Sequence, residues 1–353
     1  MSQKTIFSVK GLPVLQNRMF STIDEALRCP VGDIELVQDM DTGLIFNSAF
    51  VSDKLVYDVD YQNEQACSGV FQGHLNDVTE IIDRHFQDQS LIEVGCGKGY
   101  FLDHLQALKY LITGVDPAYE GANQSVVKAH FERSLGLSAD GVVLRHVLEH
   151  IEDPVSFISS IAHANGGKGL IYIEVPCFDW ICRHRAWFDI FYEHVNYFRL
   201  PDFYRMFSSI VESGYVFGGQ YLYVVADLAS LRVPHWDPKC ATSMSEDFLS
   251  DVDNIVSVAQ QGPQNVIWGG ASKGVIFAIY MERAGVSIDY VIDVNPAKQG
   301  KYLAGSGLRV SAPEEAMASM NKGCNVFVMN SNYFDEIVEQ SCGKYKYYRV
   351  DNE

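Results

Sequence analysis

The sequence has no Cys-x-x-Cys pair, no apolar run that approaches the ~20 residues of a membrane span, and few basic residues. Its 27 lysines and arginines stand against 45 aspartates and glutamates, for a net charge of −18. Binding to nucleic-acid phosphates needs a basic surface, so we expect neither a nucleic-acid partner nor a membrane. No signal-peptide pattern opens the chain, and the eight cysteines lie mostly in apolar runs, as buried thiols do in a reducing compartment. We therefore expect a cytoplasmic protein.

Residues 91–119 carry the strongest local pattern in the chain. Leu91–Val94 is a short apolar run that contains an acid, Glu93, and it suits a buried parallel strand. Three glycines follow, at Gly95, Gly97 and Gly99. Without side chains there, the backbone can turn sharply and a ligand can lie against it. Asp116 ends the next predicted strand, about 20 residues past the glycines, where an acid can accept both hydroxyl groups of a ribose.

The glycine spacing distinguishes this loop from a dinucleotide site. It is Gly-x-Gly-x-Gly, whereas dinucleotide folds use Gly-x-Gly-x-x-Gly. Glu93 would repel a pyrophosphate but attract a cation. The pattern resembles the first motif of class I S-adenosylmethionine-dependent methyltransferases, whose cofactor carries a sulfonium and an amino group. The alternative is a structural glycine turn in another α/β domain.

Hydrophobic patterning divides the chain into three parts. Residues 1–60 are predicted to be β-rich. The strands expected in the middle part are 91–94, 111–115, 129–132, 141–146, 170–175 and two within 215–232. The helices expected there are 69–86, 100–110, 121–128, 154–164 and 201–214. After a helix over 244–261, the last part starts a new βαβ pattern and predicts a second, small parallel sheet, with strands at 265–268, 290–294 and 326–329.

Ionisable residues gather in two places after the fourth predicted core strand. Residues 146–154 follow its carboxyl end, where open α/β sheets bind ligands. Residues 188–198 are dense in aromatic and ionisable groups and include Glu193 and His194. For His194, the alternative to a functional role is an ordinary polar residue packed at the sheet edge.

Two further segments leave their roles open. Tyr57 and Tyr61 precede the first core helix and could fold over the cofactor as a lid, or pack under the sheet. The glycine turn at 269–274 could hold a phosphate on its amides with help from Lys273, or serve as a structural turn. It has neither the Walker spacing nor the dinucleotide fingerprint.

Three sets of residues resemble a three-part family of sugar C-methyltransferases, which act on deoxysugars carried on a nucleotide diphosphate. They are Tyr61-x-Asn63-x-Gln65-x-x-Ser68-x-x-Phe71-x-x-His74-Leu75, the pair Leu148-Glu149-His150-Ile151 and Phe191-Tyr192-Glu193-His194, and Gly270-Ala-Ser-Lys273-Gly274 with Asp293-x-Asn295-Pro296-x-Lys298-Gln299-Gly300-Lys301-Tyr302-Leu303. The resemblance implies an α/β fold with a central Rossmann-like methyltransferase sheet. It also implies a small β-rich N-terminal part and a second Rossmann-like C-terminal domain. The expected boundaries are 1–68, 69–240 and 241–353.

One feature of that family is missing. Its N-terminal part usually binds zinc through Cys-x-x-Cys pairs, but the equivalent places here, Phe7–Lys10 and Asp39–Thr42, contain no cysteine. Structural zinc needs about four thiolate or imidazole ligands. We therefore expect no metal, and an N-terminal module that is only zinc-ribbon-like.

The resemblance and the chemistry of methyl transfer suggest roles for the candidate residues. A sugar carbon becomes a nucleophile only after a proton beside a keto group is removed, so a general base is needed. We assign that base to His194, with Glu193 orienting it or acting on a sugar hydroxyl, and with Tyr192 and His150 holding the keto oxygen or the ring. The cofactor residues are Glu93, Gly95, Gly97, Asp116 for the ribose, Pro117, Phe131 beside the adenine, and His146. The substrate residues are Tyr61 and Lys273.

The expected cofactor is S-adenosyl-L-methionine, with S-adenosyl-L-homocysteine as product, and the expected partner is a nucleotide-diphosphate sugar. Other functions remain open alternatives. One is an O- or N-methyltransferase of another small metabolite, and another is a non-catalytic binding protein that keeps the cofactor fold. A nicotinamide oxidoreductase fits the glycine spacing least well.

Overall fold

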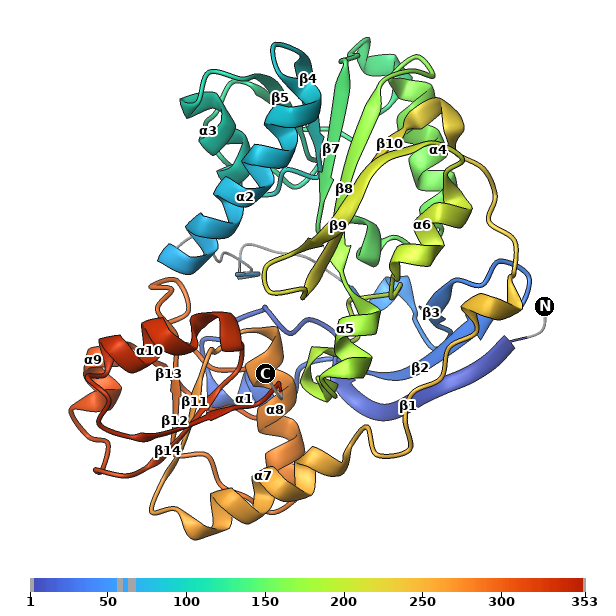
Figure 1. Cartoon of the computed structure of the whole chain (residues 1–353). Helices are drawn as coiled ribbons and strands as arrows, with labels where there is room; N and C mark the ends of the chain where they lie inside the picture. Colours follow the sequence, from blue (N-terminus) through green and yellow to red (C-terminus); the bar gives the residue numbers. More distant parts are fainter. Residues whose placement is uncertain (1–2, 56–59, 63–67, 352–353) are drawn as a thin grey trace.

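The computed structural model describes residues 3–55, 60–62 and 68–351, and those ranges contain three β-sheets (Figure 1). The first sheet is antiparallel, in the order β1-β2-β3. Its strands are β1 (Gln3–Pro13), β2 (Val31–Asp39) and β3 (Ile45–Asn47), and a short helix, α1 (Ile23–Leu27), lies between β1 and β2. The β-rich N-terminal part is therefore confirmed. The turn before β3 is closed by the Gly43 N–H, which donates to the Asp39 carbonyl at 2.7 Å.

The central sheet has seven strands in the order β6-β5-β4-β7-β8-β10-β9. The first five are parallel, and β10 and β9 close the edge in antiparallel pairing. The strands are β4 (Ser90–Val94), β5 (Leu111–Val115), β6 (Val126–Val127), β7 (Gly141–Arg145), β8 (Leu170–Pro176), β9 (Ile210–Val216) and β10 (Tyr221–Asp227). The helices are α2 (Gly69–Phe86), α3 (Tyr100–Ala107), α4 (Pro154–Ala164), α5 (Phe178–Arg183) and α6 (Leu200–Met206). This is the doubly wound α/β arrangement that the sequence predicts.

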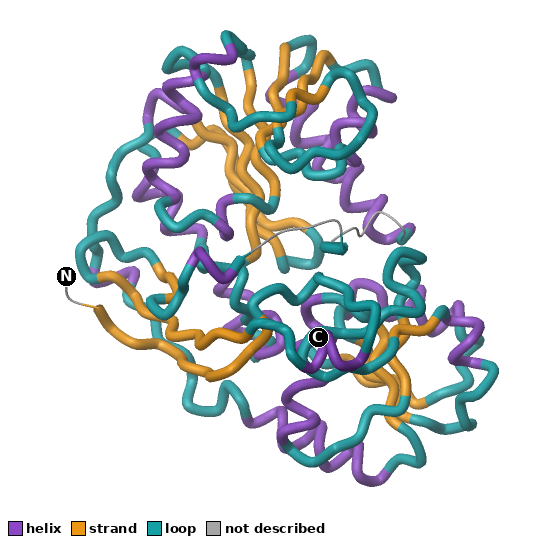
Figure 2. Tube along the Cα trace, turned by 180° about the vertical axis from the view of Figure 1, so that it is seen from behind, coloured by secondary structure: helices purple, strands orange, loops and turns teal. Residues whose placement is uncertain are grey.

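The C-terminal sheet has five parallel strands in the order β13-β12-β11-β14-β15. The strands are β11 (Asn265–Trp268), β12 (Tyr290–Ile292), β13 (Val310–Ser311), β14 (Asn325–Val328) and β15 (Lys346–Arg349). The helices are α7 (Ser250–Gln261), α8 (Ser272–Arg283), α9 (Pro313–Met317) and α10 (Phe334–Gln340). The second parallel sheet is thus confirmed. Seen from behind, the two parallel sheets occupy opposite ends of the molecule, and the N-terminal strands run beside the junction between them (Figure 2).

Two elements expected after β5 are wrong. No helix covers 121–128 and no strand covers 129–132; a loop with the two-residue strand β6 takes their place. The Asn123 side chain accepts the Ser125 N–H at 2.9 Å and so stabilises a turn there.

Two other predicted helices are too long. The helix expected over 201–214 ends at Met206, because the backbone becomes extended at Phe207 and leads into β9. The helix expected over 244–261 begins only at Ser250. By contrast, α2 has the predicted bounds, because the Ser68 hydroxyl caps it through the Val70 N–H and its apolar residues recur on one buried face.

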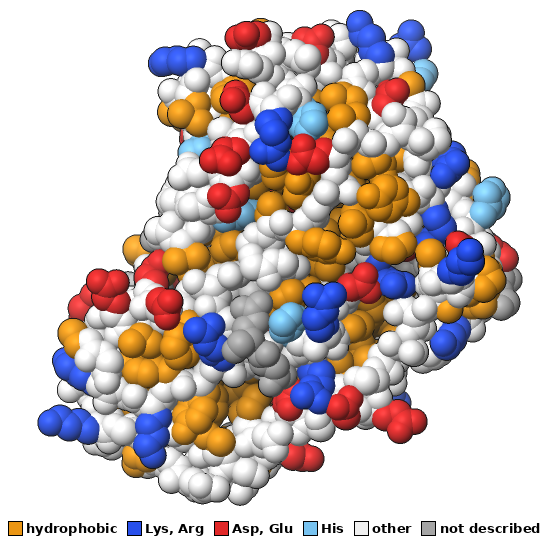
Figure 3. All heavy atoms as spheres, viewed as in Figure 1, with side chains coloured by type: hydrophobic (Ala, Val, Ile, Leu, Met, Phe, Trp, Pro, Cys, Tyr) orange, Lys and Arg blue, Asp and Glu red, His pale blue; other side chains and the backbone are white. Residues whose placement is uncertain are grey.

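The surface carries charges of both signs. On the face seen in Figure 3, acidic and basic side chains are interspersed and no broad basic patch is present. Within the described ranges, no helix combines the length and the apolar character needed to cross a membrane.

Candidate active site

The carboxyl ends of the parallel strands of the central and C-terminal sheets border one cavity of about 380 Å³. Its volume lies in the usual range for small-molecule sites. From the central sheet the cavity is lined by Glu93 on β4, Arg145 on β7 and Pro176 on β8. From the C-terminal sheet it is lined by Trp268 on β11, Asp293 after β12 and Met329 after β14. A ligand in this cavity would therefore contact both sheets at the end where doubly wound folds bind ligands.

The glycine loop after β4 forms one wall of the cavity. Gly95, Gly97 and Gly99 all have positive φ, at 73°, 54° and 84°. A Cβ at Gly95 would lie 2.5 Å from Val147, whereas a Cβ at Gly97 would meet no atom within 4 Å. Gly95 is thus required for packing, and Gly97 leaves the backbone open toward the cavity, as the sequence predicts.

Glu93 is placed to receive a cation. The residue is 4% exposed, and its Oε2 has no hydrogen-bond partner in the described part of the chain. Burial raises the pKa of Glu93 to about 7, although the nearby Arg145 guanidinium acts to lower it. A buried carboxylate oxygen without a partner is costly, and a cationic ligand would satisfy it. The residues here therefore fit the sulfonium and amino groups of S-adenosylmethionine.

Asp116 closes the glycine loop from the end of β5. Its Oδ2 accepts the Gly97 N–H at 2.9 Å, and its Oδ1 accepts the Ala118 N–H at 2.7 Å. The residue does not line the cavity in this structure. Its contact with the ribose stays a prediction. Each carboxylate oxygen keeps a lone pair that could accept a hydrogen bond from a ribose hydroxyl group.

Replacing Asp116 with Ala is expected to weaken S-adenosylmethionine binding by roughly 1–3 kcal/mol, because a charged acceptor is lost. Isothermal titration calorimetry measures this directly. Equal affinity in the variant would contradict the ribose assignment.

Besides Asp116, three further predicted site residues lie away from the cavity lining. Phe131 is 7% exposed and packs in the main apolar core, because the strand expected to carry it does not form. Pro117 lies exposed in the loop after β5. Tyr192 is fully buried, and its hydroxyl accepts the Val51 N–H at 2.8 Å while its ring packs on Gly32. Tyr192 therefore holds the N-terminal part in place, and its contact with the acceptor stays a prediction.

His150 and His194 face each other on the cavity wall. Their ring centroids are 5.0 Å apart with an edge-to-face angle of 79°. His150 Nδ1 lies 2.8 Å from the Glu193 carbonyl, which orients this ring as an Nδ1–H donor. Burial lowers the pKa of His194 well below its usual value, and the neighbouring His150, His146 and Lys273 lower it further. His194 is thus neutral at physiological pH, as a general base must be.

Glu193 does not orient His194 in this structure. Its Oε2 accepts the Tyr61 hydroxyl at 2.6 Å, and its Oε1 accepts the Gln16 N–H at 3.1 Å. The side chain is buried and links the N-terminal part to the active site. Tyr61 lines the cavity, and its role as a lid stays a prediction. Tyr57, Asn63 and Gln65 lie outside the described residues.

His146 is placed at the cavity by a strained backbone, with φ of 51°. Its Nε2 lies 2.9 Å from Glu174, although out of line for a hydrogen bond, and its Nδ1 lies 3.5 Å from Glu149. Burial alone would lower the pKa of His146, but these two carboxylates raise it to about 9. His146 is therefore cationic and lines the cavity from beside the donor loop.

The sequence analysis missed Glu174, although an acid inside the apolar run of β8 is a visible signal. Glu174 is fully buried and accepts hydrogen bonds from Arg145 at 3.2 Å and from the Tyr172 hydroxyl at 2.7 Å. His74 Nε2 lies 2.9 Å away. Burial would raise the pKa of Glu174, but Arg145 and the two histidines hold it well below its usual value.

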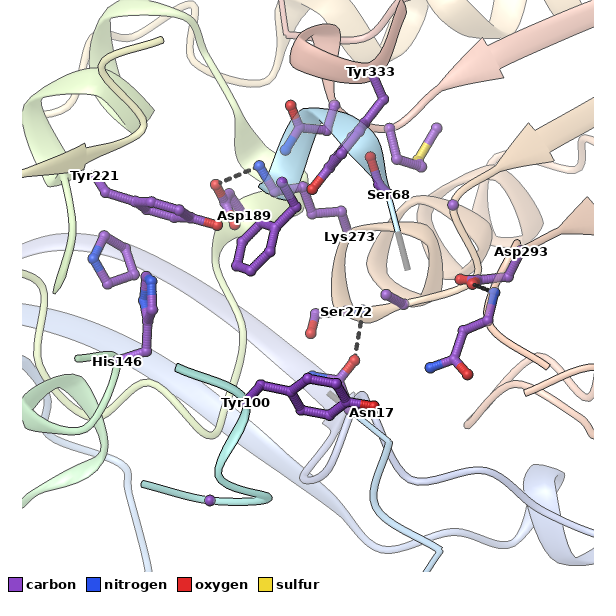
Figure 4. Close-up of a pocket in the computed structure, with 18 of the residues that line it drawn as sticks. Asn17, Ser68, Tyr100, His146, Asp189, Tyr221, Ser272, Lys273, Asp293 and Tyr333 are labelled. Carbon is purple, nitrogen blue, oxygen red and sulfur yellow. Dashed lines mark hydrogen bonds and ion pairs between the residues drawn. The ribbon is translucent and has the colours of Figure 1, made fainter. Parts of the chain in front are cut away.

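Lys273 lies in the first turn of α8 and joins the two large parts of the molecule. Its Nζ is 2.9 Å from Asp189 (Figure 4). It also donates to the Gln220 side chain at 3.1 Å. The Ser272 N–H in the same turn donates to Asn17 at 3.2 Å. Lys273 lines the cavity, but its charge is already paired, so the turn has an evident structural role. Its contact with the substrate stays a prediction.

Comparison with known proteins agrees with this geometry. A methyltransferase-domain family model matches residues 70–210, and the model of the C-methyltransferase C-terminal domain matches residues 242–347. The C-methyltransferase NovU of Streptomyces niveus is 22% identical over 292 residues, which cover 70% of this chain and 68% of that protein. A ubiquinone biosynthesis O-methyltransferase of Methylobacterium sp. (strain 4-46) is 31% identical over 99 residues, which cover 24% of this chain and 39% of that protein.

Solved structures with a similar chain trace cover about half of this chain. The magnesium protoporphyrin IX methyltransferase of Synechocystis PCC 6803 with bound S-adenosylhomocysteine covers 45% of this chain and 82% of its own, at 18% identity and a TM-score of 0.34. The PH0226 protein of Pyrococcus horikoshii OT3 covers 49% of this chain and 99% of its own, at 10% identity and a TM-score of 0.38.

The glycine loop with its buried acid and the matched domains define this chain as a class I S-adenosylmethionine-dependent methyltransferase. More narrowly, it belongs to the methyltransferases that join this catalytic domain to a C-methyltransferase C-terminal domain.

Proposed function

We propose that this enzyme methylates a carbon atom of a nucleotide-linked keto-deoxysugar, with His194 as the general base. The observation that supports this most is the single cavity that joins the donor loop, the histidine pair and the C-terminal sheet. An acceptor in that cavity can reach all three at once. We also propose that the three sheets correspond to functional parts with boundaries at 1–68, 69–240 and 241–353.

The bound donor supplies an electrophilic methyl group, so the protein's main task is to position a nucleophile in line with it. Glu93 and the open backbone at Gly97 hold the donor on the wall formed by the glycine loop. His194 removes a proton from the acceptor carbon beside the keto group. His150 and the cationic His146 line the same space and can stabilise the enolate oxygen that forms.

The features of the C-terminal sheet favour an acceptor that carries a nucleotide. Its strand order around β11 is that of a mononucleotide-binding half, with a glycine turn after β11 and Asp293 after β12. Lys298 is buried at this end, 3.4 Å from Asp293, and both residues line the cavity. We assign this side of the cavity to the nucleotide and the side near His194 to the sugar.

An O-methyltransferase is the second candidate, because the O-methyltransferase from Methylobacterium is 31% identical to this chain over 99 residues. There the same histidine would deprotonate a hydroxyl group. The two reactions leave the new methyl group on different atoms of the acceptor.

Methyl transfer to a panel of nucleoside-diphosphate keto-deoxyhexoses tests the proposal. With ¹³C-methyl S-adenosylmethionine, mass spectrometry is expected to show a methylated sugar, and NMR is expected to place the label on carbon. A label on oxygen would support the second candidate. Absence of transfer across the panel would contradict a nucleotide-linked keto-sugar as acceptor.

A further inference from the structure

Glu149 lies beside the two active-site histidines, on the short 3₁₀ turn Leu148–His150 that follows β7. A carboxylate oxygen of Glu149 and ring nitrogens of His150 and His194 all lie within 4.8 Å of one another. Glu149 is 1% exposed, and its Oε2 has no hydrogen-bond partner in the ranges that the structure describes. Such an oxygen is costly to bury unless a proton or a cation reaches it at some stage of the reaction.

The carboxylate of the neighbouring acid, Glu193, is already hydrogen-bonded elsewhere. Both of its carboxylate oxygens accept hydrogen bonds from the N-terminal part, one from Tyr61 and one from Gln16. Only its backbone carbonyl takes part in the histidine pair, through His150. Of these two adjacent acids, Glu149 is therefore the one with an oxygen available to His194.

Glu149 is held from behind by a series of charged and polar side chains. Its Oε1 lies 3.5 Å from the Nδ1 of His146, and the Nε2 of His146 lies 2.9 Å from Glu174. Glu174 in turn is held by Arg145 and Tyr172. This series of contacts fixes the carboxyl group of Glu149 at the cavity wall.

We propose that Glu149 is the positioning residue for His194: it orients the neutral imidazole and stabilises the imidazolium that forms when the acceptor is deprotonated. This inference rests on the proposed carbon methylation. In that reaction the acceptor C–H bond breaks, its proton moves to His194, and its electron pair becomes the enolate. The enolate carbon then bonds to the methyl group as the bond from methyl carbon to sulfur breaks, with its electrons left on sulfur. The proton passes from His194 to Glu149 and leaves to solvent with the product.

The test measures exchange of the acceptor hydrogen for deuterium, with S-adenosylhomocysteine in place of the methyl donor. The acceptors are the nucleoside-diphosphate keto-deoxyhexoses. Glu149→Gln is expected to slow exchange about 100-fold at saturating acceptor, with the acceptor KM within threefold of wild type, because the imidazolium loses its carboxylate. Glu149→Asp keeps the charge and is expected to retain at least a tenth of the rate. Glu152→Gln, an exposed acid three residues away, is the matched control and is expected to exchange at the wild-type rate.

Exchange in Glu149→Gln within threefold of wild type would overturn the proposal. So would an equal loss in the aspartate and glutamine variants, since charge would then not be the cause. Two histidines with a carboxylate are also a common set of metal ligands, so the wild-type assay is repeated with EDTA. Exchange that survives chelation supports the proton route, and exchange abolished by it contradicts that route.

If the wild-type enzyme catalyses hydrogen exchange on none of these acceptors, the proposed function fails. The contact between Glu149 and His194 is then tested without an acceptor. Nitrogen-15 NMR of histidine-labelled protein saturated with S-adenosylhomocysteine reports the tautomer of His194. If Glu149 orients His194, one N–H tautomer of His194 is expected to dominate. This tautomer is expected to be lost in Glu149→Gln and kept in Glu152→Gln. An unchanged tautomer in Glu149→Gln would contradict the inference.

Discussion

Replacing His194 with Gln is expected to lower kcat by about 10²–10⁴-fold, because the acceptor then has no base. The side chain keeps its size, and the donor wall around Glu93 is untouched, so S-adenosylmethionine affinity is expected to stay within twofold. Because the pKa of His194 lies well below its usual value, the wild-type kcat should show no titration of this group between about pH 6 and 8. Steady-state kinetics and calorimetry on the same preparations measure both effects.

His235→Gln is the matched control, because His235 is exposed in the segment before α7. It is expected to leave kcat and donor affinity at wild-type values. A His194→Gln enzyme that turns over at a rate close to wild type would remove His194 from the mechanism. A loss of donor affinity equal to the loss of rate would mean that the histidine shapes the donor site instead.

Replacing Glu93 with Gln is expected to move donor affinity and protein stability in opposite directions. Affinity for S-adenosylmethionine should fall about 10- to 100-fold, because a hydrogen bond to a charged group is lost. The free protein should become more stable by about 3 kcal/mol above pH 7, since the pKa of Glu93 is raised to about 7 from its ordinary value of 4.5. Calorimetric binding and chemical denaturation measure the two changes.

The pH dependence follows from the direction of that shift. A carboxyl with a raised pKa destabilises the folded chain as pH rises above 4.5, and its full effect is reached above pH 7. The stability gain of the variant should therefore vanish in acid. Wild-type donor affinity, measured relative to the variant, should be about tenfold weaker at pH 6 than at pH 8, since the carboxyl must lose a proton to bind the cation. A ratio that does not change with pH would contradict an ionised Glu93 in the complex.

Local patterns predicted the secondary structure around the glycine loop well. The apolar strand with Glu93, the glycine turn and the amphipathic helix after it depend on neighbours in sequence, and they form as expected. The predicted helix over 121–128 failed because Asn123 favours a turn that single-residue propensities do not weigh heavily. Elements with a clear period were thus easier to predict than the loop between them.

The side-chain pairings in the active site could not be read from sequence order. Glu193 is next to His194 in the chain, yet its side chain binds Tyr61, 132 residues away. Glu149 is 45 positions from His194 and lies beside it only after β7 and the 188–198 segment come together. Likewise, the hydroxyl of Tyr192 binds the backbone of Val51, 141 residues away. Such pairings depend on the tertiary fold, which periodicity does not encode.

The most direct test of the account is a crystal structure with S-adenosylhomocysteine bound. We expect the amino group beside Glu93, the sulfur above the glycine loop, and the His194 imidazole across the cavity, with space for one sugar ring between the sulfur and the imidazole. A sulfur that faces away from His194, or a donor bound at the C-terminal glycine turn, would contradict it.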